Sequence, residues 1–261
     1  MTTLDAILLG VVQGLTEFLP VSSSGHLKLV QYFLGLQNLD RYIVFDLVCH
    51  LGSLLAIIMV FFRPIRHLFA TNSRRLWQVV IGTLPLFPLL LIMKPIKAVY
   101  ADPSYLGFFF LLTAAILFVG CRFGKIVSEI DRQKHPWRDA LLIGVWQAVA
   151  IFPGVSRSGS TISGARLLGW GAYDAVFFSF LLAIPAILGG TVLEVFKLWL
   201  HPETVLDLPL SDYIAGFVTS FLVGFASLQL LLKLAVQNKF SYFAWYCLFL
   251  GLMTIYYFHF H

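Results

Sequence analysis

One predicted helical face near the start of the chain combines small and polar residues. Gln13, Gly14 and Glu17 follow Gly10 by three, four and seven residues, so a helix would carry all four as one stripe, with Gln13 and Glu17 one turn apart. The neighbouring residues are apolar, and a carboxylate is costly in a membrane segment, which favours a functional role for Glu17. The alternative is a helix-packing seam in which Gln13 and Glu17 hydrogen-bond to a neighbouring helix.

A proline interrupts the chain just after this stripe and is followed by hydroxyl and imidazole groups. After Pro20, residues 22–26 read SSSGH. A serine becomes a nucleophile when a base takes its proton, and histidine can act as a base, an acid or a nucleophile. A turn with a capping serine and a structural histidine is the alternative, but the clustering with Glu17 favours chemistry.

A second interruption has the composition of an anion-binding turn. Residues 153–161 read PGVSRSGST. Its glycines permit close backbone approach, and a helix predicted to begin near Thr161 would add backbone N–H groups to the hydroxyls and to Arg157, a combination that binds phosphate. The GxxxxGK[ST] spacing of a Walker loop is missing. The alternative is a glycine-rich turn whose Arg157 reaches the membrane interface, but its place between polar residues in the middle of the segment favours a site.

Three other polar residues are weaker candidates. Asp46 and His50 are one helical turn apart, and they either line the site or, as we favour, form a satisfied interhelical pair. Arg166 is expected to extend to the cytoplasmic interface.

The composition indicates that membrane helices position all of these residues. The chain has 261 residues, of which 59% are hydrophobic and 12% charged, whereas soluble domains carry about 25% charged residues. This excludes a cytosolic enzyme, a coiled coil and a disordered chain. We predict a single integral membrane domain over residues 1–261, with no second, soluble domain.

Six apolar segments have the length of membrane spans, and loop charge predicts their orientation. The segments are 43–62, 76–93, 105–121, 172–196, 213–233 and 240–258, with the second kinked by Pro85 and Pro88. Three connections are rich in Lys and Arg, within the connection or at its flanks: 63–75, 122–138 and 234–239. All three fall on one side of the membrane if these six segments span it. Because such loops stay in the cytoplasm, both termini are predicted to face outward.

The two interrupted segments, 4–34 and 139–171, are predicted to form re-entrant helical hairpins. Irregular backbone at membrane depth is tolerated only when it is buried in protein or lines a wet cavity. The segments resemble each other, since LGVVQ at 9–13 matches IGVWQ at 143–147 and Ser-x-Ser-Gly occurs in both. The prediction is therefore an all-α polytopic membrane protein of about six transmembrane helices plus two re-entrant helical hairpins, arranged as an inverted repeat. Repeat one covers 1–121, a cytoplasmic connector 122–138 and repeat two 139–261, with the site at the repeat interface.

Two runs resemble the motifs of a known family. Residues 13–26, QGLTEFLPVSSSGH, resemble the (E/Q)xxxE segment and the following serine, glycine and histidine of bacterial undecaprenyl-diphosphate phosphatases, also called bacitracin resistance proteins. Residues 153–161 resemble the PGxSRSGxT segment of the same family. The resemblance extends over essentially the whole chain in length and span layout. It implies hydrolysis of the lipid carrier undecaprenyl diphosphate to the monophosphate for peptidoglycan synthesis, bacitracin resistance, divalent-cation dependence, and a site open to the periplasmic side of the bacterial inner membrane.

With this resemblance, each motif residue has an expected role. We expect Ser23 to attack the terminal phosphorus, with Glu17 as its base or as a metal ligand; the resemblance favours Ser23 over Ser22 and Ser24. His26 would protonate or position a phosphate oxygen and Arg157 would stabilise the transition state, while His26 as nucleophile and direct attack by water remain open. The residues expected to bind substrate are Gln13, Ser22, Ser156, Ser158, Gly159 and Thr161. Mg²⁺ or Ca²⁺ is expected on Glu17 and Gln13 together with the phosphates, because both ions prefer oxygen ligands; Gln13 is the neutral variant of the first motif position.

Two other classes of function compete with a phosphatase. Inverted repeats and a membrane glutamate also suit a polyprenyl-phosphate flippase or another secondary transporter, but the polar groups concentrate at two interruptions instead of lining a path across the bilayer. A non-catalytic lipid-binding protein would leave the serine, histidine and glutamate cluster unexplained. The expected partners are a polyprenyl diphosphate and bilayer lipid, with a homodimer as a candidate assembly and no nucleic acid.

Overall fold

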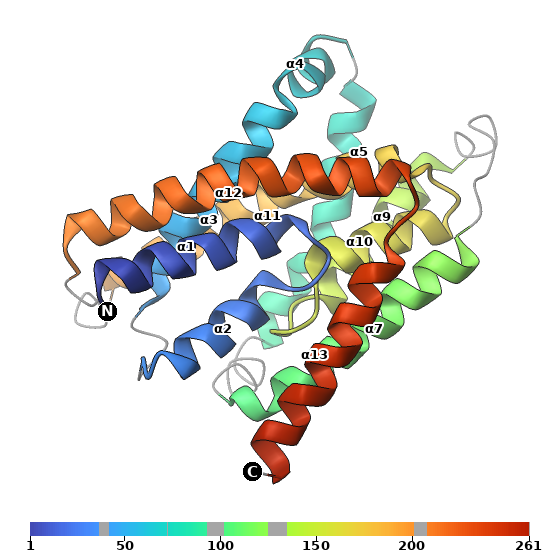
Figure 1. Cartoon of the computed structure of the whole chain (residues 1–261). Coiled ribbons are helices and arrows are strands. Elements are labelled where there is room, and N and C mark those ends of the chain that lie inside the picture. The colour runs from blue at the N-terminus through green and yellow to red at the C-terminus, as the bar shows by residue number, and fades with distance from the viewer. Residues whose placement is uncertain (37–41, 72, 93–101, 125–134, 201–207, 261) are drawn as a thin grey trace.

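The computed structural model describes residues 1–36, 42–71, 73–92, 102–124, 135–200 and 208–260 (Figure 1). Every regular element within these ranges is helical, which confirms the all-α prediction. The first half contains α1 Thr3–Phe18, α2 Ser23–Phe33, α3 Ile43–Val60, α4 Phe62–Thr71, α5 Ser73–Thr83, the 3₁₀ turns η2 Leu84–Leu86, η3 Pro88–Ile92 and η4 Pro103–Tyr105, and α7 Leu106–Phe123. The second half contains α9 Pro136–Val149, α10 Arg157–Leu167, α11 Ala172–Leu200, α12 Leu210–Val236 and α13 Ser241–Phe260.

Five helices of the described chain are long and apolar enough to cross a bilayer. They are Ile43–Val60, Pro103–Phe123, Ala172–Leu200, Leu210–Val236 and Ser241–Phe260, and they correspond to five of the six predicted spans. The span predicted at 76–93 is not one kinked α-helix, because α5 ends at Thr83 and 3₁₀ turns continue to Ile92. Pro85 and Pro88 lack the N–H groups that would continue an α-helix. The predicted count of six spanning helices is therefore not confirmed.

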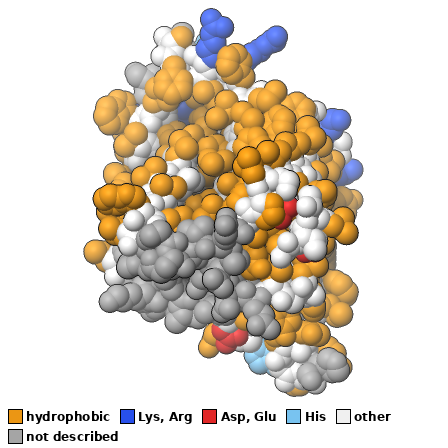
Figure 2. All heavy atoms as spheres, turned by 90° about the vertical axis from the view of Figure 1, so that its left-hand side faces the viewer, with side chains coloured by type: hydrophobic (Ala, Val, Ile, Leu, Met, Phe, Trp, Pro, Cys, Tyr) orange, Lys and Arg blue, Asp and Glu red, His pale blue; other side chains and the backbone are white. Residues whose placement is uncertain are grey.

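The outer surface agrees with a membrane location. Hydrophobic side chains cover much of the described part of the face in Figure 2, and Lys and Arg side chains stand at its upper end. In Figure 1 this end carries α4, the helix with Arg63 and Arg66 of the predicted basic connection 63–75. Residues 125–134 of the predicted basic connection 122–138 lie outside the described ranges, whereas the predicted basic connection 234–239 lies within them.

Both predicted hairpins consist of two helices separated by an irregular break. Residues 19–22, the first break, join α1 to α2, and residues 150–156, the second break, join α9 to α10; the helices contact each other within each hairpin. Serine side chains cap the second helix in both cases, since Ser22 Oγ accepts the Gly25 N–H and Ser156 Oγ accepts the Gly159 N–H. The Ser156 cap starts α10 at Arg157, four residues earlier than the predicted start near Thr161.

Glycine-lined seams fix the hairpins in the bundle. In Figure 1, α12 lies along α1 and α3, and α13 lies along α7. Gly10 and Gly14 of α1 face the backbone of α12 at Gly216 and Ser220. The counterpart of Gly10 in the second hairpin, Gly144, faces the backbone of α5 at Gly82 in the same way. Each hairpin thus packs on a helix of the other half, which supports the inverted repeat; the repeat itself stays a prediction.

Replacing Gly14 with alanine is expected to destabilise the fold. A Cβ at this position would lie 2.6 Å from the Ser220 carbonyl oxygen and 2.8 Å from the Gly224 nitrogen, so the α1 and α12 backbones must separate. Overpacking of this kind costs about 1–3 kcal/mol, more than alanine gains over glycine in helix propensity. Gly189→Ala is the matched control, because no atom of the described residues lies within 4 Å of its added Cβ. Thermal unfolding in detergent checks this, and equal midpoints for the two variants would contradict the close packing.

Candidate active site

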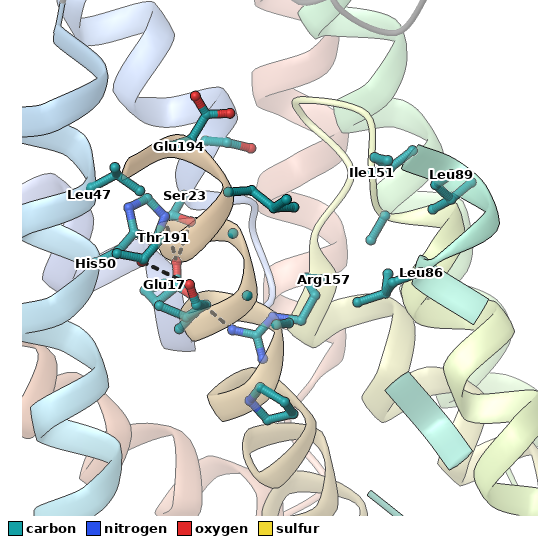
Figure 3. Close-up of a pocket in the computed structure, with 18 of the residues that line it drawn as sticks. Glu17, Ser23, Leu47, His50, Leu86, Leu89, Ile151, Arg157, Thr191 and Glu194 are labelled. Atoms are coloured by element: carbon teal, nitrogen blue, oxygen red, sulfur yellow. Dashed lines mark hydrogen bonds and ion pairs between the residues drawn. The ribbon is translucent and has the colours of Figure 1, made fainter. Parts of the chain in front are cut away.

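A cavity of about 730 Å³ opens between the two breaks (Figure 3). Residues of both breaks line it, together with side chains from α1, α3, the α5–η3 segment and α11. Figure 3 shows Glu17, Ser23 and His50 on one side of Arg157, and Leu86, Leu89 and Ile151 on the other. The cavity therefore has a polar wall and an apolar wall.

Glu17 is the centre of the polar wall. Its Oε1 accepts a hydrogen bond from Arg157 Nη2 at 2.7 Å, and its Oε2 accepts one from Ser23 Oγ at 2.6 Å and one from Gln13 Nε2 at 3.1 Å. His50 Nε2 lies 3.7 Å from the same Oε2. The Glu17 side chain is only 6% exposed, so these donors compensate for the loss of water around a buried carboxylate.

Of the three adjacent serines, Ser23 is the one whose hydroxyl is aligned with a base. A base must lie within hydrogen-bond reach of the proton it takes, and Glu17 meets this condition for Ser23. Ser22 Oγ instead accepts the Gly154 N–H at 3.1 Å and the Gly25 N–H at 3.4 Å, so it holds the two breaks together. Ser24 Oγ lies 3.5 Å from Ser22 Oγ. The geometry supports the choice of Ser23 over its neighbours.

Arg157 connects the two motifs across the cavity. One arm of its guanidinium binds Glu17, and Nη1 donates to the Ser179 carbonyl oxygen of α11 at 3.3 Å. The guanidinium carbon also lies 5.9 Å from the centre of the Phe180 ring, within the range of a cation–π contact. An arginine held in this way does not extend to a membrane interface, so the alternative considered for Arg157 is wrong.

The remaining residues of the second motif divide into two groups. Ser156 and Ser158 line the cavity, and their hydroxyls lie 3.2 Å apart. Gly159 and Thr161 are absent from the described lining. The Gly159 N–H donates to Ser156 Oγ at the start of α10, and the Thr161 hydroxyl bonds the hydroxyl of Ser179 on α11 at 2.6 Å. Ser156 and Ser158 are thus placed to touch a ligand, whereas Gly159 and Thr161 shape the turn.

The predicted pair Asp46 and His50 separates into two roles. Asp46 accepts a hydrogen bond from Gln31 Nε2 of α2 at 3.0 Å, which is the interhelical contact we favoured. His50 lines the cavity, with Nδ1 bonded to the Asp46 carbonyl oxygen and Nε2 directed toward Glu17. For His50 the favoured prediction of a purely structural pair is therefore wrong.

His26 lies elsewhere, although its sequence position suggested proximity to Glu17. It is absent from the described cavity lining, and its two ring nitrogens bond the Ser22 carbonyl oxygen and the hydroxyl of Tyr246. The structure thus brings Glu17, Ser23 and Arg157 together at the cavity, while Gln13 bonds Glu17 but is, like His26, absent from the described lining.

Three polar residues that hold the site lie outside both sequence motifs. Thr113 of α7 clamps the second break, because its hydroxyl donates to the Gly154 carbonyl oxygen at 2.7 Å and accepts the Ser156 N–H at 3.0 Å. Ser179 of α11 binds Arg157 through its backbone carbonyl oxygen and Thr161 through its hydroxyl, and Tyr246 of α13 binds His26. All three stand alone in apolar spans, where a polar side chain is itself a signal, but no motif indicates their partners.

The polar wall has limited capacity for a divalent cation. Gln13 Oε1 is buried and has no hydrogen-bond partner among the described residues, while Gln13 Nε2 bonds Glu17; Gln13 itself is absent from the described cavity lining. No group of three His, Cys, Asp or Glu side chains in the described ranges is suited to a metal ion. One carboxylate and one amide oxygen fit Mg²⁺ when phosphate supplies other ligands, which is how Mg²⁺ often binds in proteins.

Comparison with known proteins extends over nearly the entire chain. The family model described as "Bacitracin resistance protein BacA" matches residues 6–253, which include both motifs. An undecaprenyl-diphosphatase of Protochlamydia amoebophila is 51% identical over 259 residues, or 99% of this chain and 99% of that protein. Undecaprenyl-diphosphatases of Methanosphaera stadtmanae and Rhodopirellula baltica are 34% and 37% identical, covering 97% and 95% of this chain and 96% and 95% of their own.

Proposed function

The chain belongs to the bacitracin resistance protein BacA family, and we propose from this membership that it hydrolyses undecaprenyl diphosphate to undecaprenyl phosphate and inorganic phosphate. It is a membrane phosphatase whose product re-enters peptidoglycan synthesis, and the name of its family links this activity to bacitracin resistance. The observation that carries this proposal is the contact of Glu17 with both Ser23 and Arg157 inside one cavity. That contact joins a base, a hydroxyl and a phosphate-binding cation from two motifs 140 residues apart in the chain.

The geometry supports a two-step mechanism through Ser23. Its Oγ attacks the terminal phosphorus, Glu17 takes the hydroxyl proton, and the bond from phosphorus to the bridging oxygen breaks. Undecaprenyl phosphate leaves, and the proton on Glu17 passes to it. Water then attacks the phosphoserine while Glu17 takes a proton from the water and returns it to Ser23 Oγ, which releases inorganic phosphate.

Arg157 and the second break stabilise the charge that develops on the phosphoryl oxygens. The guanidinium stands beside the Ser23 hydroxyl through their shared partner Glu17, and the hydroxyls of Ser156 and Ser158 line the same wall. At a low-dielectric site, hydrogen-bond donors that are fixed before the reaction stabilise the developing charge more than mobile water does. Gln13 and Glu17 would hold a Mg²⁺ or Ca²⁺ ion, which would neutralise phosphate charge when bound.

The opposite wall fits a prenyl chain. It includes Leu86, Leu89 and Ile151. Burying such a chain gains roughly 25 cal/mol per Å² of apolar area, so this wall supplies affinity while the polar wall orients the diphosphate.

Phosphate release from undecaprenyl diphosphate by detergent-purified protein tests the function. Release without a membrane is the expected result, and it would exclude a protein that only transports the lipid. The rival flippase or secondary transporter predicts no release in detergent but movement of the lipid between leaflets of vesicles.

We also propose that the cavity opens to the periplasm, with both termini on that side of the inner membrane. The Lys and Arg asymmetry of the connections supports this orientation. Alkaline phosphatase fused to the C-terminus is expected to be active, whereas a fusion after Asn238, in the turn between α12 and α13, is expected to be inactive. The reverse pattern would contradict the orientation and the inverted repeat. A homodimer stays a prediction, tested by cross-linking in native membranes.

A further inference from the structure

His26 and Tyr246 form a pair on the side of the first break away from the cavity. His26 lies in the first turn of α2 and Tyr246 in α13, and neither belongs to the described cavity lining. His26 Nε2 lies 2.8 Å from the Tyr246 hydroxyl, and His26 Nδ1 lies 2.7 Å from the Ser22 carbonyl oxygen. Both ring nitrogens therefore have protein partners.

These partners determine where the imidazole carries its proton. A carbonyl oxygen can only accept, so Nδ1 must carry hydrogen and donate it to Ser22. In the neutral ring Nε2 then presents a lone pair, and the Tyr246 hydroxyl donates to it. In this state no N–H of His26 is free for a phosphate, and the one lone pair that a nucleophile or base would use is already bonded.

The packing around the imidazole ring also shields His26 from a substrate phosphate. His26 is only 8% exposed. Its ring stacks on that of Tyr246, with centroids 5.7 Å apart and planes 10° apart, and the Phe110 ring meets it edge-on at 5.2 Å. A diphosphate would have to displace aromatic side chains to reach this imidazole.

His26 binds Ser22, a residue with a strained backbone conformation. Ser22 has φ of +73°, a conformation that costs a non-glycine residue about 1–3 kcal/mol and persists only when its surroundings fix it. The Ser22 carbonyl oxygen accepts His26 Nδ1 as well as the His26 backbone N–H at 3.2 Å, while its hydroxyl is fixed by the second break. Ser23 follows directly, with its hydroxyl aimed at Glu17.

We propose that Tyr246 and His26 are positioning residues that fix the strained turn at Ser22, and thereby the Ser23 hydroxyl, and that His26 exchanges neither a proton nor a phosphoryl group with the substrate. This inference rests on the proposed phosphatase function. It assigns a role to Tyr246, which no motif marks, and it separates His26 from the chemistry that its place beside the serines suggests.

Two substitutions of His26 distinguish positioning from chemistry. His26→Asn keeps an N–H donor near the Nδ1 position but cannot carry a proton or a phosphoryl group in turnover, and His26→Gln places its amide near the Nε2 position instead. We expect His26→Asn to retain kcat within about tenfold of the natural protein, and His26→Gln to fall at least about tenfold further, because the loss of the Nδ1 donor leaves the Ser22 carbonyl oxygen with only the longer hydrogen bond from the His26 backbone N–H. A nucleophile or proton donor would be lost equally in both. KM should change less than twofold in His26→Asn.

Tyr246→Phe keeps the stacked ring and removes only the hydroxyl. Its kcat is expected to fall about three- to tenfold, the effect of one neutral hydrogen bond, with KM unchanged. Tyr242→Phe is the matched control, since Tyr242 is exposed one turn earlier on α13 and should keep full activity. Size-exclusion profiles and thermal midpoints verify that each variant is folded.

Nitrogen NMR of histidine-labelled protein tests the pair without any turnover, with the His26→Asn spectrum identifying the His26 signals. We expect a proton on Nδ1, none on Nε2, and a shift of the Nε2 signal in Tyr246→Phe. A proton on Nε2 alone, an acid-labile phosphohistidine trapped during turnover, or equal inactivity of folded His26→Asn and His26→Gln would overturn the inference. If the natural protein releases no phosphate, the proposed function fails, and the NMR result still decides the His26 geometry.

Discussion

Replacing Ser23 with alanine is expected to lower kcat by about a thousandfold or more, while the affinity for substrate stays within about threefold. Alanine removes the oxygen that would attack phosphorus, and the Ser22 hydroxyl does not take its place, because it is committed to Gly154 and Gly25. Binding should survive because the hydroxyls of Ser156 and Ser158 and the apolar wall are unchanged. Phosphate release and binding of a non-hydrolysable diphosphate lipid, measured in the same detergent, check both statements.

Two companion variants identify the attacking group if Ser23→Ala remains active. Direct attack by water predicts appreciable hydrolysis by Ser23→Ala and a larger loss in Glu17→Gln, since Glu17 would then activate the water. A histidine nucleophile predicts a trapped acid-labile phosphohistidine, which a serine phosphate ester does not resemble. Substantial turnover by Ser23→Ala would reject the serine mechanism and leave family membership intact.

The local part of the site was predictable because it depends on helical period alone. Gln13 and Glu17 are one turn apart in a helix, and the structure shows their side chains 3.1 Å apart at the hydrogen-bonding atoms. The helical stripe that contains them has both of the roles considered for it, a helix-packing seam and a part of the site. Gly10 and Gly14 form the packing seam with α12, while Glu17 reaches the cavity and Gln13 bonds Glu17.

The direction of side chains after a turn was not predictable from sequence distance. His26 follows Glu17 by nine residues, but the unusual backbone at Ser22 directs it toward Phe110 and Tyr246. His50, which is 33 residues beyond Glu17 and separated from it by α2, reaches the carboxylate instead. Proximity in sequence is informative within one helix and loses that value across an irregular break.

The coupling between the two motifs required the tertiary structure. Ser22 Oγ accepts the Gly154 N–H, and an added Cβ at Gly25 would lie 2.9 Å from Gly154 Cα, so the breaks meet backbone to backbone. The residues that complete this junction, Thr113 and Ser179, are isolated in apolar spans. Apolar length predicted five long helices correctly, but it could not show that the prolines at 85 and 88 end α5 and leave 3₁₀ turns to line the cavity.

Replacing Arg157 with lysine is expected to lower kcat by about a hundredfold or more, although the charge is kept. The guanidinium spans Glu17 on one arm and the Ser179 carbonyl oxygen on the other. A single ammonium group cannot make both contacts and also present an N–H fork to a phosphoryl group. Arg166→Lys is the matched control on the same helix, because Arg166 bonds the Trp170 carbonyl oxygen and Asn238 away from the cavity. The activity of this variant should change less than about twofold.

Kinetics of the two variants, with folding verified by thermal midpoint, separate two explanations for the role of Arg157. If only a positive charge is needed to balance buried Glu17, lysine suffices and turnover stays close to that of the natural protein. If the planar fork stabilises the transition state, kcat falls in Arg157→Lys alone, and the loss appears in kcat more than in KM because the contact strengthens only as charge develops on phosphate.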